Sequence, residues 1–139
     1  MQTLTVLIGL FALTISSPQD DTIAQAFAHY EAIRAALAAD HVKDVSRHAT
    51  ALAPLAEKVG GKEARESAEM VGAAKDLKAA REQFGKLSAA LIPAFEKARL
   101  DGVNFFTCSM AEQSWAQKGK AIQNPYYGKS MLTCGTPKK

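Results

Sequence analysis

Apolar side chains recur every three or four residues through much of this chain, and beyond Gly102 the pattern stops. The stripes cover residues 23–37, 45–59 and 77–95, with a weaker, alanine-rich stretch between the last two. Such spacing places side chains on one face of an α-helix. Aromatic residues make up only 7% of the chain, which suits helices that pack closely through small side chains. The sequence therefore predicts a mostly α-helical bundle of about four helices.

Turn and capping residues divide the stripes into separate helices. Asp20 and Asp21, after the breaker Pro18, are the candidate N-caps of the first helix. Gly60 and Gly61 form a strong stop after the second helix, and Gly102 ends the fourth.

The segment after Gly102 predicts an irregular C-terminal cap containing short strands or turns. Residues 103–107 favour a strand, and residues 111–119 suggest a short helix around Trp115. Residues 124–128 carry turn signals, and residues 131–134 suggest a short return strand.

The first 17 residues carry no charged side chain and are predicted to be a signal peptide. Residues 4–15 are apolar apart from Thr and Gly, but this run is shorter than the roughly 20 residues that span a bilayer. Small residues and Pro18 follow it, as in a secretory signal. The alternative, an apolar first helix, is disfavoured by Pro18. We expect a single exported domain, residues 18–139, that is periplasmic or secreted and has no membrane span.

Charge and motif content exclude several function classes. The 17 basic and 14 acidic residues are scattered along the chain, which argues against a nucleic-acid partner. The sequence contains no recognisable nucleophile–base order, phosphate loop or apolar carboxylate pair. We therefore expect a protein that is not an enzyme.

The only two cysteines of the chain both lie in the predicted cap, and each has a methionine close by. On a strand, Cys108 and Met110 would share one face, because side chains alternate with period two. Met131 and Cys134 are three residues apart, which brings them together on a tight turn. Soft sulfur ligands favour Cu(I). Zinc is less favoured because a thioether is a poor ligand for it.

A disulfide is the competing interpretation of the same two residues. In an oxidising compartment two cysteines usually pair. A bond between Cys108 and Cys134 would close a loop of 26 residues (134 − 108), worth about 3 kcal/mol by loop-closure entropy. Spacing alone leaves both interpretations open.

Several other residues are expected to build or complete the site. Pro125 and Gly128 would reverse the chain between the cysteines. Trp115, Tyr126 and Tyr127 would shield the loop from water.

His48 is the candidate nitrogen ligand. It lies on the apolar stripe of the second helix, where a lone histidine is more often a hydrogen-bonded core residue. The other histidines, His29 and His41, are expected to be exposed.

A specific C-terminal motif resembles a known family. The chain resembles a small uncharacterised bacterial periplasmic domain, also found at the C-terminus of copper/silver efflux adaptor proteins. The resemblance covers residues 23–136, although this family usually has proline where Ser109 stands. The matching residues are Arg81, Phe84, Leu87, Ser88, Cys108, Met110, Ala111, Trp115, Ile122, Asn124, Pro125, Tyr126, Tyr127, Gly128, Met131, Cys134 and Gly135.

The resemblance implies periplasmic copper handling, with a heavy-metal efflux adaptor or another periplasmic copper protein as partner. Cys108, Met110, Met131 and Cys134 match the family's sulfur positions. The leading hypothesis is a protein that sequesters Cu(I) or passes it to an efflux partner. One alternative is a disulfide-stapled interaction module without metal. Another is an electron-transfer copper site that also uses a histidine such as His48.

Overall fold

The computed structural model describes residues 15–139, so most of the predicted signal peptide, residues 1–14, lies outside the described residues. Four helices come first: α1 (Pro18–Ala38), α2 (Lys43–Gly60), α3 (Lys62–Ala73) and α4 (Leu77–Ala98). The cap follows with β1 (Val103–Cys108), β2 (Gln113–Lys118), a 3-10 turn η1 (Gly128–Ser130) and β3 (Thr136–Pro137). The predicted fold class, a helical bundle with a C-terminal cap of short strands and turns, is confirmed.

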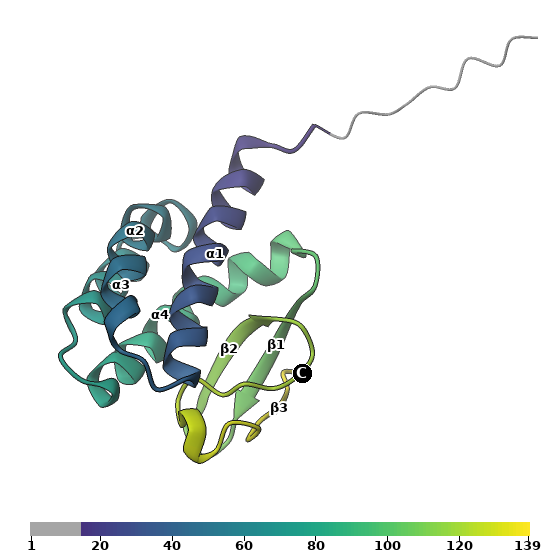
Figure 1. The fold of residues 1–139 in the computed structure, drawn as a ribbon. Coiled ribbons are helices and arrows are strands. Elements are labelled where there is room, and N and C mark those ends of the chain that lie inside the picture. The colour runs from purple at the N-terminus through teal and green to yellow at the C-terminus, as the bar shows by residue number, and fades with distance from the viewer. Residues whose placement is uncertain (1–14) are drawn as a thin grey trace, which may run out of the picture.

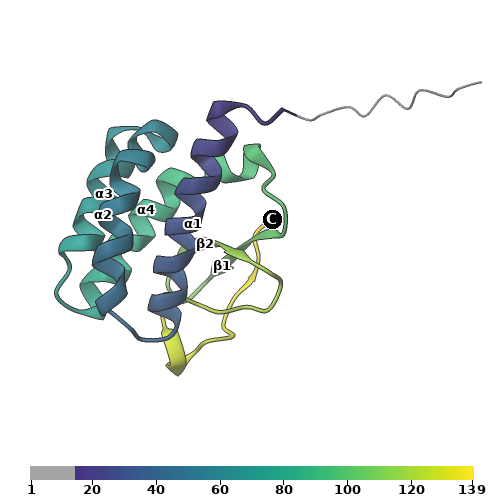
Figure 2. The same cartoon turned by 45° about the horizontal axis from the view of Figure 1, so that its top comes forward.

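The bundle and the cap are packed against each other. The three strands form one antiparallel sheet in the order β2–β1–β3. Strand β2 contacts α1 and α4, so the sheet lies on that side of the bundle, away from α2 and α3 (Figures 1 and 2). Phe27, Tyr30, Phe84 and Phe95 form an aromatic cluster between α1 and α4. The cap packs against this cluster.

The start of α1 differs from the expectation. Ser17, not Asp20 or Asp21, is the N-cap: its hydroxyl accepts the Asp20 N–H at 3.2 Å, and the Asp20 carboxylate accepts the Ser17 N–H. Pro18 occupies the first helical position, where its missing N–H costs nothing. The two aspartates instead lie in the first turn, where negative charge is favoured by the helix dipole.

The cap contains the predicted first strand but differs elsewhere. Residues 111–119 are not a helix: Trp115 lies in β2, paired with Phe106, because this places its indole in the core between sheet and bundle. The return strand is β3, two residues beyond Cys134, and residues 131–134 form a turn in which the Cys134 N–H donates to the Met131 carbonyl at 3.1 Å.

Across residues 15–139, no helix combines the length and the apolar character needed to cross a bilayer.

A candidate metal centre at the two cysteines

Cys108 and Cys134 meet at the centre of the cap. Cys108 is the last residue of β1, and Cys134 lies just before β3, which pairs with β1. Cys108 is completely buried and Cys134 is half-buried, and both are free thiols. Burial, together with the hydrogen bond to Cys108, raises the pKa of the Cys134 thiol. The structure thus brings the two predicted sulfur residues into direct contact.

Asn124 fixes the backbone of Cys134. Its buried side-chain amide donates to the Cys134 carbonyl at 2.7 Å, and its Oδ1 accepts the N–H groups of Tyr126 and Tyr127 at 2.8 and 3.3 Å. Its own N–H donates to the Leu132 carbonyl. One asparagine therefore ties the loop at residues 124–128 to the segment that carries Cys134.

An arginine on α4 holds the same loop against the helices. Arg81 donates to the Pro125 carbonyl and the Leu37 carbonyl, each at 2.8 Å, and pairs with Asp40. The hydrogen bond from Arg81 lowers the pKa of Asp40. Gly128 lies so close to this ion pair that a Cβ there would overlap both the Asp40 carboxylate and the Arg81 guanidinium.

A buried hydroxyl network joins the cap to the bundle. The Tyr126 hydroxyl donates to the Ser114 carbonyl of β2 and lies 3.2 Å from Ser88 Oγ on α4. The Ser88 hydroxyl is hydrogen-bonded to Tyr30 at 2.7 Å, and Tyr30 accepts the Ala116 N–H of β2. Burial raises the pKa of both tyrosines, so both remain neutral at ordinary pH.

Trp115 packs against Gly135, the residue next in sequence to Cys134. The Trp115 indole is fully buried and donates to Gln117 at 3.0 Å. A Cβ at Gly135 would lie 2.7 Å from the Trp115 ring, so the backbone next to Cys134 packs directly on the indole. Trp115 and Tyr126 are buried, whereas Tyr127 is only half-buried.

Two residues that anchor the cap were missed by the sequence analysis. Arg34 is 3% exposed and donates to the Gln123 carbonyl at 3.1 Å while pairing with Glu31. Gln117 accepts the Gln123 N–H and donates to the Ala121 carbonyl. A signal existed for Arg34, because it stands beside Ile33, four residues after Tyr30, on a predicted buried face.

The two methionines lie in different environments. Met131 is half-buried and shares the turn that ends at Cys134. Met110 is 60% exposed, in the turn between β1 and β2. The expectation that Cys108 and Met110 share a strand face is wrong, because β1 ends at Cys108.

His48 does not join the thiols. It is half-buried on α2, and its Nδ1 lies 3.2 Å from Nδ1 of His29 on α1. The hydrogen-bonded alternative for His48 is therefore what the structure contains, although its partner His29 was expected to be exposed. Among residues 15–139, no group of three or more His, Cys, Asp or Glu side chains is arranged to hold a metal ion.

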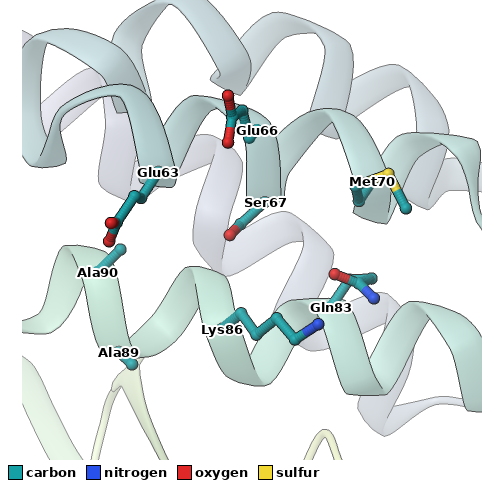
Figure 3. A pocket seen from close by; sticks show the side chains of 8 residues that line it. All are labelled: Glu63, Glu66, Ser67, Met70, Gln83, Lys86, Ala89 and Ala90. Carbon is teal, nitrogen blue, oxygen red and sulfur yellow. The ribbon is translucent and has the colours of Figure 1, made fainter.

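A surface hollow of the bundle lies away from both cysteines. A space of about 630 Å³ opens between α3 and α4 (Figure 3). Glu63, Glu66 and Met70 line it from α3, and Gln83 and Lys86 from α4. Its lining is of mixed charge and contains neither cysteine, so it adds nothing to the sulfur site.

Together these features define a small helical domain whose C-terminal cap holds a pair of free thiols. The chain belongs to the family described as "Protein of unknown function (DUF3347)", whose model matches residues 26–101. The match includes the bundle residues Arg34, Arg81 and Ser88 that hold the cap, and it ends before Cys108. Neither the curated proteins nor the solved structures contain a match to this chain.

Proposed function

We propose that this is an exported copper-binding protein that holds Cu(I) as cargo between the thiolates of Cys108 and Cys134. The observation that carries the proposal is the direct contact of these two thiols, which come from segments 26 residues apart (134 − 108). Thiolates are the side chains that Cu(I) prefers, and Cu(I) needs only two of them.

The donor set fits Cu(I) better than zinc. A structural zinc site is closed by four nitrogen, oxygen or sulfur ligands. In the described part of the chain, the cysteines have no third Cys, His, Asp or Glu with which to form such a group. A thioether is a weak additional ligand for Cu(I), and Met131 is the better placed because it shares a turn with Cys134. Met110, on the exposed turn, is suited to receiving or releasing the ion at the surface.

Copper binding must displace thiol protons. Both burial and the hydrogen bond to Cys108 favour the protonated form of Cys134. Metal affinity therefore rises with pH, as it does wherever ligands are deprotonated on binding. The complete burial of Cys108 also keeps water and competing ligands away from its sulfur atom.

Export and the partner complete the proposal. The uncharged apolar run at residues 4–15 supports a periplasmic location. The resemblance of the motif to the C-terminal domain of copper/silver efflux adaptors supports delivery to such a pump, without catalysis by this chain.

Anaerobic competition against a Cu(I) chelator tests the proposal. Cys108→Ser and Cys134→Ser should each abolish tight binding, whereas Met131→Leu should weaken it and preserve the fold. Met70→Leu is the matched control, since Met70 is an exposed thioether on α3, at a hollow that contains neither cysteine. Equal copper retention by wild type and the double serine variant would refute the copper site.

A disulfide-stapled interaction module is the second candidate, favoured by the same contact. In an oxidising compartment, two adjacent thiols form a disulfide unless metal occupies them. Thiol titration after unfolding of the protein from its native host separates the two candidates. Two free thiols together with bound copper support the copper site, whereas the absence of free thiols supports the disulfide. The electron-transfer alternative would need a histidine at the thiols, and His48 contacts His29 instead.

A further inference from the structure

Two histidines, one on α1 and one on α2, face each other through their ring nitrogens. Nδ1 of His29 on α1 lies 3.2 Å from Nδ1 of His48 on α2, and the ring centroids are 5.6 Å apart with a tilt of 47°. The rings therefore point at each other through their nitrogens and are not stacked. Both side chains are half-buried and remain accessible to small ions.

A single proton joins the two Nδ1 atoms. Nη2 of Arg47 lies 3.4 Å from Nε2 of His48. A guanidinium only donates hydrogen bonds, so Nε2 of His48 is the acceptor and its proton is on Nδ1. That Nδ1–H then donates to the lone pair of Nδ1 of His29. When this proton moves through solvent from Nδ1 to Nε2 of His48, the ring stays neutral and two Nδ1 lone pairs are directed into the same space.

The spacing of these nitrogens is that of two ligands on one metal ion. Two imidazole nitrogens, each about 2.0 Å from a tetrahedral zinc ion, lie about 3.3 Å apart. We propose that His29 and His48 form a second metal site, which takes a borderline divalent cation such as Zn²⁺ through the two Nδ1 atoms. On binding, the shared proton moves from Nδ1 to Nε2 of His48, so both rings bind as neutral imidazoles. Water fills the other positions, because the described residues offer no group of three ionisable ligands.

This site is independent of the proposed copper site. It uses nitrogen donors on α1 and α2, whereas the thiols lie in the cap on the other side of α1. With only two protein ligands and partial exposure, it is an exchangeable site on the bundle surface. Arg47 sets its strength, because the guanidinium repels a cation and holds His48 in the competing tautomer.

Calorimetric titration of the full chain with Zn²⁺, under anaerobic conditions near pH 7.5, tests the site. His29→Gln and His48→Gln should each weaken Zn²⁺ binding by about tenfold or more. His41→Gln, which changes the exposed third histidine, should bind like wild type. The double variant Cys108→Ser with Cys134→Ser should also retain binding. Circular dichroism establishes that each variant is folded.

Two further measurements leave both proposed ligands, His29 and His48, in place. Arg47→Gln should bind Zn²⁺ more tightly than wild type. In wild type, Zn²⁺ should shift the NMR signals of the imidazole nitrogens of His29 and His48 and leave those of His41 in place. The proposal is overturned if the two histidine variants bind like wild type, if binding disappears only in the serine variant, or if the nitrogen signals do not move.

Discussion

Gly128 shows how a single residue determines the position of the site loop. Its φ is 56°, a region that other residues rarely adopt, and its Cα lies against the Asp40–Arg81 pair. Any side chain would push the loop away from the ion pair that holds it. The turn residues predicted a chain reversal here, but not the close approach of a carboxylate 88 residues earlier (128 − 40).

Gly128→Ala should therefore destabilise the protein by about 2 kcal/mol or more, through overlap added to backbone strain. Gly119→Ala is the matched control, because Gly119 has a φ of 83° and a Cβ there would meet nothing within 4 Å, so only the strain remains. Urea denaturation monitored by Trp115 fluorescence measures both. Equal losses of stability in the two variants would show that the contact with Asp40 and Arg81 is unimportant.

At the scale of elements, the loop at residues 122–130 is an anchored connection between sheet and bundle. Arg34 on α1 and Arg81 on α4 each donate to a carbonyl of this loop. Both contacts are partly buried, and they make the position of Cys134 depend on residues of two distant helices. The burial of Arg34 left a signal in the sequence, but the carbonyl groups that these arginines contact could not be predicted, because a hydrogen bond to a backbone carbonyl leaves no pattern in the receiving segment.

The Asp40–Arg81 pair predicts an acid-sensitive docking of this loop. Arg81 lowers the pKa of Asp40 in the folded protein, whereas an aspartate in the unfolded chain has a pKa of about 3.9. The stabilisation is therefore fully present above that value and is lost as pH falls through the folded pKa. The difference in unfolding free energy between wild type and Asp40→Asn should be largest near neutral pH and shrink below about pH 4. Asp44→Asn, at an exposed site, should show no such trend; if it does, Asp40 is not the cause.

The helices were predictable from sequence and much of the cap was not. The apolar stripes of α1, α2 and α4 specify both the elements and their buried faces, because helical periodicity is a local property. Trp115 was misassigned because six residues of mixed polarity carry no clear period, and its strand is stabilised by pairing with β1. Met110 was misplaced for a related reason: the sequence did not show that β1 ends at Cys108, before the turn that contains Met110.

At the scale of the whole molecule, the bundle supports a small cap that brings two distant thiols together. Export of this assembly predicts a processed chain. A start just before Ser17 would retain the capping box with Asp20, worth about 1 kcal/mol. Intact-mass measurement of the protein from its native host should find a mature chain that begins near Pro18. A chain that retains Met1 in the cytoplasm would contradict export.

The central claim is that Cys108 and Cys134 together bind one Cu(I) ion. X-ray absorption at the copper edge, on protein loaded anaerobically with one equivalent of Cu(I), tests it most directly. The expected result is a copper ion in the +1 state whose nearest neighbours are sulfur atoms only, with that signal lost in the variant that carries both Cys108→Ser and Cys134→Ser. A first shell of nitrogen or oxygen, or an unchanged spectrum in the double variant, would contradict the claim.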